Sequence, residues 1–404
     1  MTTVAAFAVM MMGTTIPTPL YAIYGSRFSF GVLTTTVIFA AYAAGVIAAL
    51  LLCGRWSDVF GRKPLLLGGA ALAAVSAVIF LMADGVPLLL LGRIVSGLSA
   101  GIYTGTATAA VIEAAPASWR SRAPAVATAA NIGGLGLGPL VSGLLAEYAP
   151  DPLHTPFFLN LTLIAVTGIA LCFIPEPAAA QGNIEQPDGD PGTQRPRGRQ
   201  ALRHLRVQRL SVPPEVRGVF AGPAIAAFAG FAVLGTFTAI APSFVSQLMG
   251  ISNHAVAGAV VALLLGVSAL TQILGRHLPT DRSLILGCAV LVVGVACMTW
   301  ALAAASFGLL LAGAAICGMG QGFSFSKGLA AVVTASPADR RAEVTSTYFV
   351  IAYIALCIPI IGQGLAADRW GLVSAGIGFN IGVGVLSAVA LGLIVLTVRR
   401  APAE

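Results

Sequence analysis

Long apolar runs, separated by short clusters of glycine, proline and charged residues, dominate the pattern along the chain. A run of about 18 residues or more is long enough to cross a bilayer as a helix, in which every backbone group is bonded within the segment. The pattern predicts twelve such spans and therefore an all-α membrane protein. The spans are expected at residues 3–24, 29–53, 65–84, 86–114, 121–149, 154–174, 218–248, 253–275, 283–303, 305–334, 342–367 and 371–398.

One long polar segment, residues 175–217, lies between the sixth and seventh spans and is rich in Pro, Gly, Asp and Arg. This composition is typical of a linker, with a short basic surface helix expected near residues 202–210. The chain is therefore expected to form an N-terminal six-helix bundle over residues 1–174, a cytoplasmic linker over 175–217 and a C-terminal six-helix bundle over 218–404.

An internal repeat supports this division into two bundles. Matching residues recur at a constant offset of 221 positions, which holds from the second span to the eleventh. The matched pairs include Gly97 with Gly318, Gly101 with Gly322, Pro116 with Pro337, Gly143 with Gly364, and Glu147 with Asp368. A parallel duplication of six spans is the simplest cause.

The composition excludes an ordinary water-soluble domain. Hydrophobic residues make up 57% of the chain and charged residues 9%, whereas soluble globular proteins carry about 25% charged residues. No cationic stretch precedes the first apolar run, so we expect no cleavable signal. The six cysteines lie in or at the ends of apolar runs without metal-ligand spacing, and they are expected to be packing residues.

The positive charges predict the orientation, because loops rich in Lys and Arg stay in the cytoplasm. With the linker inside, only Arg27 and Arg369 of the 22 Lys and Arg face the opposite side, while Arg93 and Lys327 lie within spans. The bias toward alanine, glycine and arginine is typical of a GC-rich bacterial genome. We therefore expect a multi-pass protein of the bacterial inner (plasma) membrane with both termini in the cytoplasm.

The loop after the second span, GRWSDVFGRKP at residues 54–64, resembles the signature loop of the major facilitator superfamily of secondary transporters. The resemblance implies that family's fold, in which two pseudo-symmetric six-helix bundles rock about a cavity lined chiefly by spans one, four, seven and ten. The matching positions are Gly54, Asp58, Gly61, Arg62 and Lys63, while Trp56 and Val59 depart from the usual leucine and cation.

This loop is expected to act as a charged hinge. Its glycines allow a tight turn, and a carboxylate at the positive N-terminus of a helix gains about 0.3–1 kcal/mol. The resemblance implies that Asp58 meets the start of the eleventh span and that Arg62 contacts Glu113 at the cytoplasmic end of span four. These contacts would lock the halves together on the cytoplasmic side. The alternative is a positively charged loop with turn glycines and no gating role.

Two cations within spans are candidates for the substrate or proton pathway. Arg93 lies about 10 Å into the fourth span, at about 1.5 Å per helical residue, and a similar arginine in the family is implicated in proton transfer or in organising the cavity. Lys327 lies in the inner third of the tenth span, where it could meet an anionic substrate. The alternative for both residues is snorkelling toward an interface.

The fifth span carries NIGGLGLGPLVSG, which resembles the motif of proton-coupled exporters in the superfamily. The matching residues are Gly134, Gly138, Pro139 and Gly143, whereas Ser142 and Ala125 stand where the motif has glycine. The motif predicts a kinked, smooth helix that span eight approaches closely and that seals or gates the periplasmic side. Generic glycine packing is the alternative.

Polar and aromatic residues within the spans are further candidates for lining the cavity. They are Tyr21, Tyr42, Tyr103, Asn131, Phe237, Gln321, Phe323 and Phe325, each of which could also be ordinary packing. No carboxylate lies near the centre of any expected span. Glu147 or Asp368 at the outer helix ends could serve as the proton carrier, and the alternative is that these interfacial acids are only solvated.

We therefore expect a secondary active transporter that exports a small, partly apolar drug or metabolite by alternating access coupled to protons. Uptake or exchange of an organic anion is the alternative, favoured by Arg93 and Lys327. A non-transporting membrane sensor or scaffold on the same fold is a second alternative. The sequence has no Walker loop for ATP. Expected partners are a small-molecule substrate, protons and the lipid bilayer, with the chain acting as a monomer. No enzymatic activity, cofactor, metal site or nucleic acid is expected.

Overall fold

The computed structural model describes residues 1–53, 56, 60–120, 122–173, 210–337 and 340–400. Within these residues, twelve helices or helix pairs are long and apolar enough to cross a membrane, and no strand is assigned. The first six, here called the first half, are α1 (Thr2–Thr15) with α2 (Pro17–Phe28), α3 (Val32–Cys53), α5 (Arg62–Leu81), α6 (Val86–Glu113), α7 (Ala123–Tyr148) and α8 (Thr155–Cys172). Most of the expected linker, with its surface helix, lies outside the described residues.

The last six spans form the second half. They are α10 (Arg217–Ala239), α12 (His254–Leu274), α13 (Thr280–Ala303), α14 (Phe307–Ala335), α15 (Arg341–Ala355) with α16 (Ile358–Trp370), and α17 (Leu372–Arg400). Beyond α10, the seventh span continues as the short helix α11 (Ala241–Ser243) and a π-helical turn, η3 (Phe244–Leu248). The twelve spans expected from the apolar runs are all found, with ends shifted by a few residues.

Besides the seventh span, in which α10 ends just before Ile240, two more spans are interrupted where the sequence predicts continuous helices. The first span breaks at Ile16, just before Pro17 and Pro19, and the eleventh breaks between α15 and α16, just before Pro359. A proline ring has no N–H and clashes with the preceding turn, so the helix cannot continue undisturbed. Both breaks divide a span into an inner and an outer segment.

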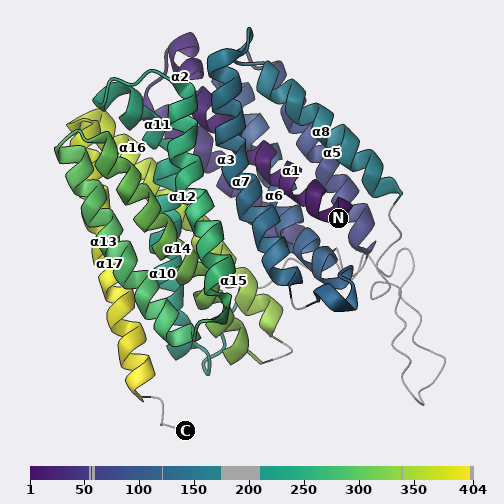
Figure 1. The fold of residues 1–404 in the computed structure, drawn as a ribbon, viewed down its shortest axis with the longest axis vertical. Helices are drawn as coiled ribbons and strands as arrows, with labels where there is room; N and C mark the ends of the chain where they lie inside the picture. The colour runs from purple at the N-terminus through teal and green to yellow at the C-terminus, as the bar shows by residue number, and fades with distance from the viewer. Residues whose placement is uncertain (54–55, 57–59, 121, 174–209, 338–339, 401–404) are drawn as a thin grey trace.

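The two halves meet along two pairs of spans. In Figure 1 the purple-to-blue helices of the first half lie beside the green-to-yellow helices of the second half. Helix α7 packs on α12, and α3 packs on α15 and α16. The outer segments α2 and α11 also touch. The 221-residue repeat relates α3 to α12 and α7 to α15 with α16, so it relates these two contacts to each other.

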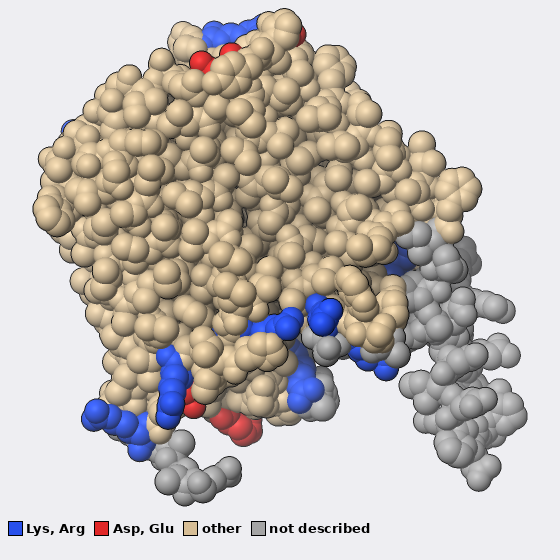
Figure 2. Space-filling model, viewed as in Figure 1, with Lys and Arg blue, Asp and Glu red and all other residues tan. Residues whose placement is uncertain are grey.

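Charged residues gather at the two ends of the molecule. Figure 2 shows Lys and Arg with a few acids at the lower end, a small charged group at the upper end and a broad uncharged band between them on this face. Such a band matches the hydrocarbon core of a bilayer. Following the orientation predicted from charge, we call the lower end, where α17 ends, the inner end and the upper end the outer end.

Glycines from the repeat bring helices into close contact in both halves. A Cβ atom on Gly97 of α6 would come within 3.0 Å of the carbonyl oxygen of Tyr42 in α3. Its repeat partner Gly318 of α14 is equally close to the carbonyl oxygen of Leu264 in α12. These glycines therefore serve helix packing, as their spacing suggests.

Candidate transport cavity and gates

A central cavity of about 70 Å³ lies between the two halves. Pockets that enclose drug-sized ligands measure about 300–1,000 Å³, so the cavity is contracted in this state. Spans two, five, eight and eleven contribute to it as well as spans one, four, seven and ten. The lining residues are Thr15, Phe39, Tyr42, Arg93, Thr104, Asn131, Ile132 and Leu135 of the first half, and Phe231, Leu234, Thr238, Leu265, Gln321, Phe325, Phe349, Tyr353 and Leu356 of the second.

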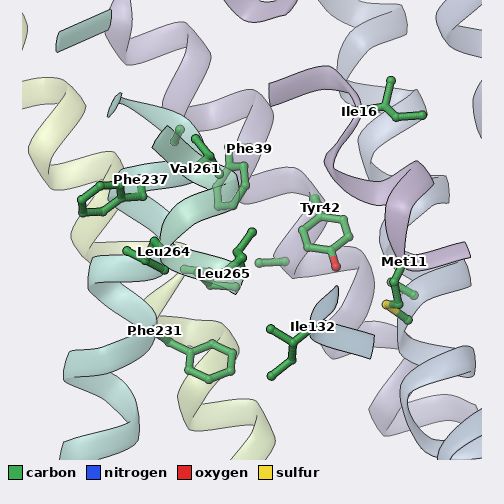
Figure 3. Packing of buried hydrophobic residues seen from close by; sticks show 14 of the residues in the cluster. Met11, Ile16, Phe39, Tyr42, Ile132, Phe231, Phe237, Val261, Leu264 and Leu265 are labelled. Atoms are coloured by element: carbon green, nitrogen blue, oxygen red, sulfur yellow. The ribbon is translucent and has the colours of Figure 1, made fainter. Parts of the chain in front are cut away.

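The wall of the cavity is mainly aromatic and aliphatic. In the close view, Tyr42 and Ile132 of the first half point toward Leu265 and Phe231 of the second (Figure 3). Threonine, tyrosine and amide groups add scattered hydrogen-bonding positions. Arg93 is the one charged residue among the lining residues, and no carboxylate is among them. Such a wall suits a solute that is largely apolar and has a few polar atoms.

Arg93 is held in the first half by its neighbours in α1 and α3. Its side chain is 1% exposed, and Nη1 donates a hydrogen bond to the carbonyl oxygen of Thr14 at 2.5 Å. The guanidinium carbon lies 4.6 Å from the ring centre of Tyr42 and 5.3 Å from that of Phe39, within the range of cation–π attraction. Among the described residues, no carboxylate forms an ion pair with it. The cavity therefore carries an uncompensated positive charge.

Pro139 lies inside α7 beside the cavity. Pro139 has no N–H to offer the carbonyl oxygen of Leu135, and the hydroxyl of Thr15 in α1 donates to that oxygen instead, at 2.8 Å. Gly134 and Gly138 let α1 approach, since a Cβ on either residue would clash with α1 atoms. These two glycines thus pack on span one, whereas the sequence predicts an approach of span eight.

The remainder of the α7 motif faces the second half near the outer end. A Cβ on Gly143 would come within 3.0 Å of the carbonyl oxygen of His254 in α12, and one on Gly258 would meet the carbonyl oxygen of Pro139. One helical turn beyond Gly143, Glu147 accepts a hydrogen bond from the backbone of α12. In this state the outer ends of α7 and α12 are therefore in close contact.

At the inner end, Arg62 lies beside Glu113, with Nη2 and Oε1 3.0 Å apart. Both residues belong to the first half, so this ion pair joins α5 to α6 and does not itself lock the two halves together. Lys63 donates to the carbonyl oxygen of Cys172 at the end of α8, at 2.7 Å. Gly61 precedes α5 with a φ of 95°, a conformation that favours glycine.

The two other residues of the signature loop, Gly54 and Asp58, lie outside the described residues. The expected contact of Asp58 with the eleventh span therefore stays a prediction.

Of the ten residues expected in the pathway or the cavity wall, five line the cavity and five do not. The lining residues are Arg93, Tyr42, Asn131, Gln321 and Phe325, whereas Lys327, Tyr21, Tyr103, Phe237 and Phe323 are not among them. Tyr103 is buried inside the first half, where its hydroxyl donates to the carbonyl oxygen of Leu66 at 2.9 Å. Tyr21 is buried in α2 and is not among the lining residues.

Lys327 lies at the inner end of the second half, away from the cavity lining. Its ammonium group donates to the carbonyl oxygens of Leu278 at 2.7 Å and Arg276 at 3.2 Å. These carbonyls belong to the turn that follows α12, at the negative end of that helix, where a cation is favourable. The contact explains how a lysine is accommodated there with 7% exposure.

Gln321 belongs to a small polar network between α14 and α12. Its amide oxygen accepts a hydrogen bond from Ser268, whose hydroxyl in turn accepts one from Gln272 at 3.2 Å. This network orients the amide of Gln321 at the cavity wall. Sequence reasoning missed Ser268 because a single serine in an apolar helix is common and gives no sign of which way it faces.

Several residues that do line the cavity were also missed, among them the aromatic residues Phe39, Phe231, Phe349 and Tyr353. Their signal is weak because aromatic side chains serve equally well against lipid. The described residues contain no group of three or more His, Cys, Asp or Glu placed to hold a metal ion.

The sequence matches the Major Facilitator Superfamily over residues 2–359. The class D tetracycline resistance protein of Salmonella ordonez is 34% identical over 147 residues, which cover 35% of each chain. Multidrug resistance protein 2 of Bacillus subtilis is 28% identical over 141 residues, or 35% of this chain and 34% of the relative. The matched part therefore spans about a third of each relative.

Solved structures share the fold over nearly the whole chain. The human organic anion transporter MFSD10 superposes with a TM-score of 0.67 at 16% identity, covering 97% of this chain and 98% of the other. A bacterial homolog of the human lysosomal transporter Spinster, in an inward-facing and occupied conformation, gives a TM-score of 0.70 at 13% identity, covering 100% and 98%. At such low identity these likenesses establish the fold alone.

Proposed function

Because the chain belongs to the Major Facilitator Superfamily, we propose that it is a secondary active transporter which exports a small, partly apolar molecule in exchange for protons. The observation that carries this proposal is the central cavity, which is walled by aromatic and aliphatic side chains from both halves. Tetracycline and multidrug resistance proteins among the relatives support the direction of transport.

The arrangement of the halves supports alternating access. The outer ends of α7 and α12 are in contact, and the cavity lies between the halves below them. Rocking of the halves would part this contact and open the cavity to the outer side. Substrate taken up from the inner side would then be released outside.

In this proposal the acids at the outer end carry the coupling proton, because no Asp or Glu is among the lining residues of the cavity. Glu147 is hydrogen-bonded to the second half, and hydrogen bonds to an ionised group are about twice as strong as those to a neutral one. Protonation of Glu147 from outside weakens this bond and favours separation of the outer ends. Asp368, its repeat partner, has the same place in the second half.

The proposal is tested in proteoliposomes with the full chain, using ethidium and tetracycline as probes. When the lumen is acidic and the external solution is neutral, we expect the probe to accumulate in the lumen through molecules whose outer end faces it. An uncoupler should abolish the accumulation, and vesicles without protein should show none. Equal uptake with and without the pH gradient would rule out proton-coupled export of these probes.

Exchange of an organic anion is the second candidate, because Arg93 brings a buried positive charge to the cavity wall and has no carboxylate partner among the residues that the structure describes. Fluorescein is a suitable anionic probe. Exchange predicts that its uptake requires a counter-anion in the lumen and proceeds without a pH gradient. Proton-coupled export predicts the opposite dependence, so a single set of vesicles separates the two candidates.

A further inference from the structure

A groove of about 620 Å³ lies between α10, α16 and α17 of the second half, and it shares no lining residue with the central cavity. It follows α17 from Ser374, near the outer end of the helix, to Leu386. Leu386 is the middle residue of the helix Leu372–Arg400. The groove therefore spans the depth of the outer leaflet and ends near the middle of the membrane.

The groove faces the bilayer. Two of its lining residues, Trp370 and Val385, are 70% and 58% exposed, although they lie on spans that are apolar enough to cross a membrane. Side chains in this position are in contact with lipid. The molecule that fills the groove must therefore come from the bilayer.

Glycines create the groove. Gly362 of α16 and Gly378 and Gly382 of α17 line it, and a Cβ atom on any of them would meet no heavy atom within 4 Å. They are therefore not required for helices to approach each other, unlike Gly143 and Gly258. At the position related to Gly362 by the repeat, the first half has Val141.

The wall of the groove changes in polarity with depth. Its outer part contains Trp370 and Ser374, whereas its deep part is lined by Val383, Val385 and Leu386. Tryptophan is enriched at the level of lipid headgroups. The groove thus matches an amphiphile whose polar end lies outside and whose hydrocarbon chain points toward the membrane centre.

Gln363 places an amide in the outer part of this wall. The side chain is 4% exposed, and its Oε1 accepts a hydrogen bond from Thr236 at 2.8 Å. Its Nε2 has no hydrogen-bond partner among the described residues. A buried donor without an acceptor costs about 1–3 kcal/mol, so an acceptor on the occupant would be favourable.

The depth of this amide agrees with an ester carbonyl. The eleventh span has 28 residues and is about 42 Å long, so each end projects about 6 Å beyond a hydrocarbon core of about 30 Å. Gln363 lies seven residues before Trp370, or about 10 Å along the helix. Its side chain is therefore about 4 Å inside the hydrocarbon, close to where the ester groups of a lipid join its chains.

We propose that this groove is a binding site for one phospholipid of the outer leaflet. One acyl chain lies along the glycines of α16 and α17, the ester carbonyl accepts a hydrogen bond from Gln363, and the headgroup lies beside Trp370. The site is separate from the transport cavity, and its existence does not depend on what the protein transports.

Native mass spectrometry of the full chain tests the site. The protein is reconstituted in vesicles of phosphatidylethanolamine and phosphatidylglycerol, extracted in detergent and examined for retained lipid. We expect one phospholipid per chain in the wild-type protein. Gly378→Leu fills the groove and should lower this occupancy at least tenfold. Gly392→Leu is the matched control, because Gly392 lies on the same helix, outside the groove, and also faces open space.

A phosphatidylethanolamine with a photoreactive diazirine at the end of one chain provides a second measurement. It should label peptides that contain Phe228 or residues 383–386, and the labelling should disappear in Gly378→Leu. Circular dichroism and the melting temperature should stay unchanged in both leucine variants, since a Cβ atom at either position meets no heavy atom within 4 Å. Absence of retained lipid in the wild-type protein, equal retention in all three proteins or labelling elsewhere would overturn the proposal.

Discussion

Glu147 at the end of α7 caps the N-terminus of α12 across the boundary between the halves. Its carboxylate oxygen Oε2 accepts a hydrogen bond from the backbone nitrogen of His254 at 2.9 Å. His254 is the first residue of α12, so the negative charge also meets the positive end of the helix dipole. This contact joins the two halves at the outer end by charge and by hydrogen bonding.

The repeat produces a related arrangement on the opposite side of the boundary. Asp368, the partner of Glu147, ends the eleventh span, and its Oδ1 lies 3.8 Å from the position of a Cβ on Gly31. Gly31 directly precedes α3, the helix that corresponds to α12. Each half therefore brings a carboxylate to the start of a helix in the other half.

Removal of the Glu147 charge should open the outer end. A capping carboxylate is worth about 1 kcal/mol, so Glu147→Ala should raise the ratio of outward-open to outward-closed molecules about fivefold. Glu147→Gln keeps an acceptor oxygen and should have a smaller effect. The ratio is measured from distances between spin labels at residues 84 and 304, in exposed loops of the two halves, in a background without the native cysteines.

The control for this series is Asp84→Asn, because Asp84 is exposed and lies outside the contact of α7 with α12. For this variant the spin labels are placed at other positions on the same two loops. Asp368→Asn should act in the same direction as Glu147→Gln. If Glu147→Ala leaves the distance distribution unchanged, the cap does not hold the outer ends together.

The close contact of α7 with α12 leads to a second prediction, which concerns Gly258. A Cβ on Gly258 would overlap the carbonyl oxygen of Pro139, whereas a Cβ on Gly266 of the same helix meets nothing within 4 Å. Gly258→Ala should therefore force the helices apart, shift the molecule toward the outward-open state and lower transport severalfold. Gly266→Ala should leave both properties unchanged. Equal transport by the two variants would show that this contact tolerates a methyl group.

The twelve spans could be predicted because length and apolarity alone decide whether a helix crosses a membrane. The interruptions of the first, seventh and eleventh spans were not expected. Pro139 lies inside α7 without ending it, while Pro17 and Pro359 coincide with breaks. In α7 the hydroxyl of Thr15 donates to the carbonyl that Pro139 leaves free, a contact that the local sequence does not reveal.

The cavity could be predicted only in part. Arg93, Asn131 and Gln321 stand out because polar groups are costly in lipid and are therefore expected to face the protein interior. Phe39 and Tyr353 give no such signal, because an aromatic side chain is equally suited to lipid and to the cavity. Lys327 also stands out as a polar residue in a span, but it does not line the cavity. Its ammonium group donates instead to backbone carbonyls at a helix end.

Lys327 should matter for stability more than for substrate affinity. Lys327→Met removes the donor from the carbonyls of Arg276 and Leu278, and unsatisfied buried acceptors cost about 1–3 kcal/mol. We expect a lower melting temperature in detergent and an unchanged KM for the transported probe. Lys327→Arg keeps N–H donors and should recover part of the stability. A raised KM with an unchanged melting temperature would instead place this ammonium on the substrate pathway.

For Arg93 we expect the reverse, namely a larger effect on transport than on stability. Its charge is buried at 1% exposure, and no carboxylate in the described part of the chain pairs with it. Arg93→Met therefore leaves no opposite charge unpaired and should not unfold the protein. The variant loses the charge that lies over Tyr42 and Phe39 at the cavity wall, and transport should fall at least tenfold. Arg93→Lys keeps the charge without the planar stacking group and should retain intermediate activity. Transport assays and melting curves on the same preparations check both expectations, and normal transport by Arg93→Met would remove this arginine from the mechanism.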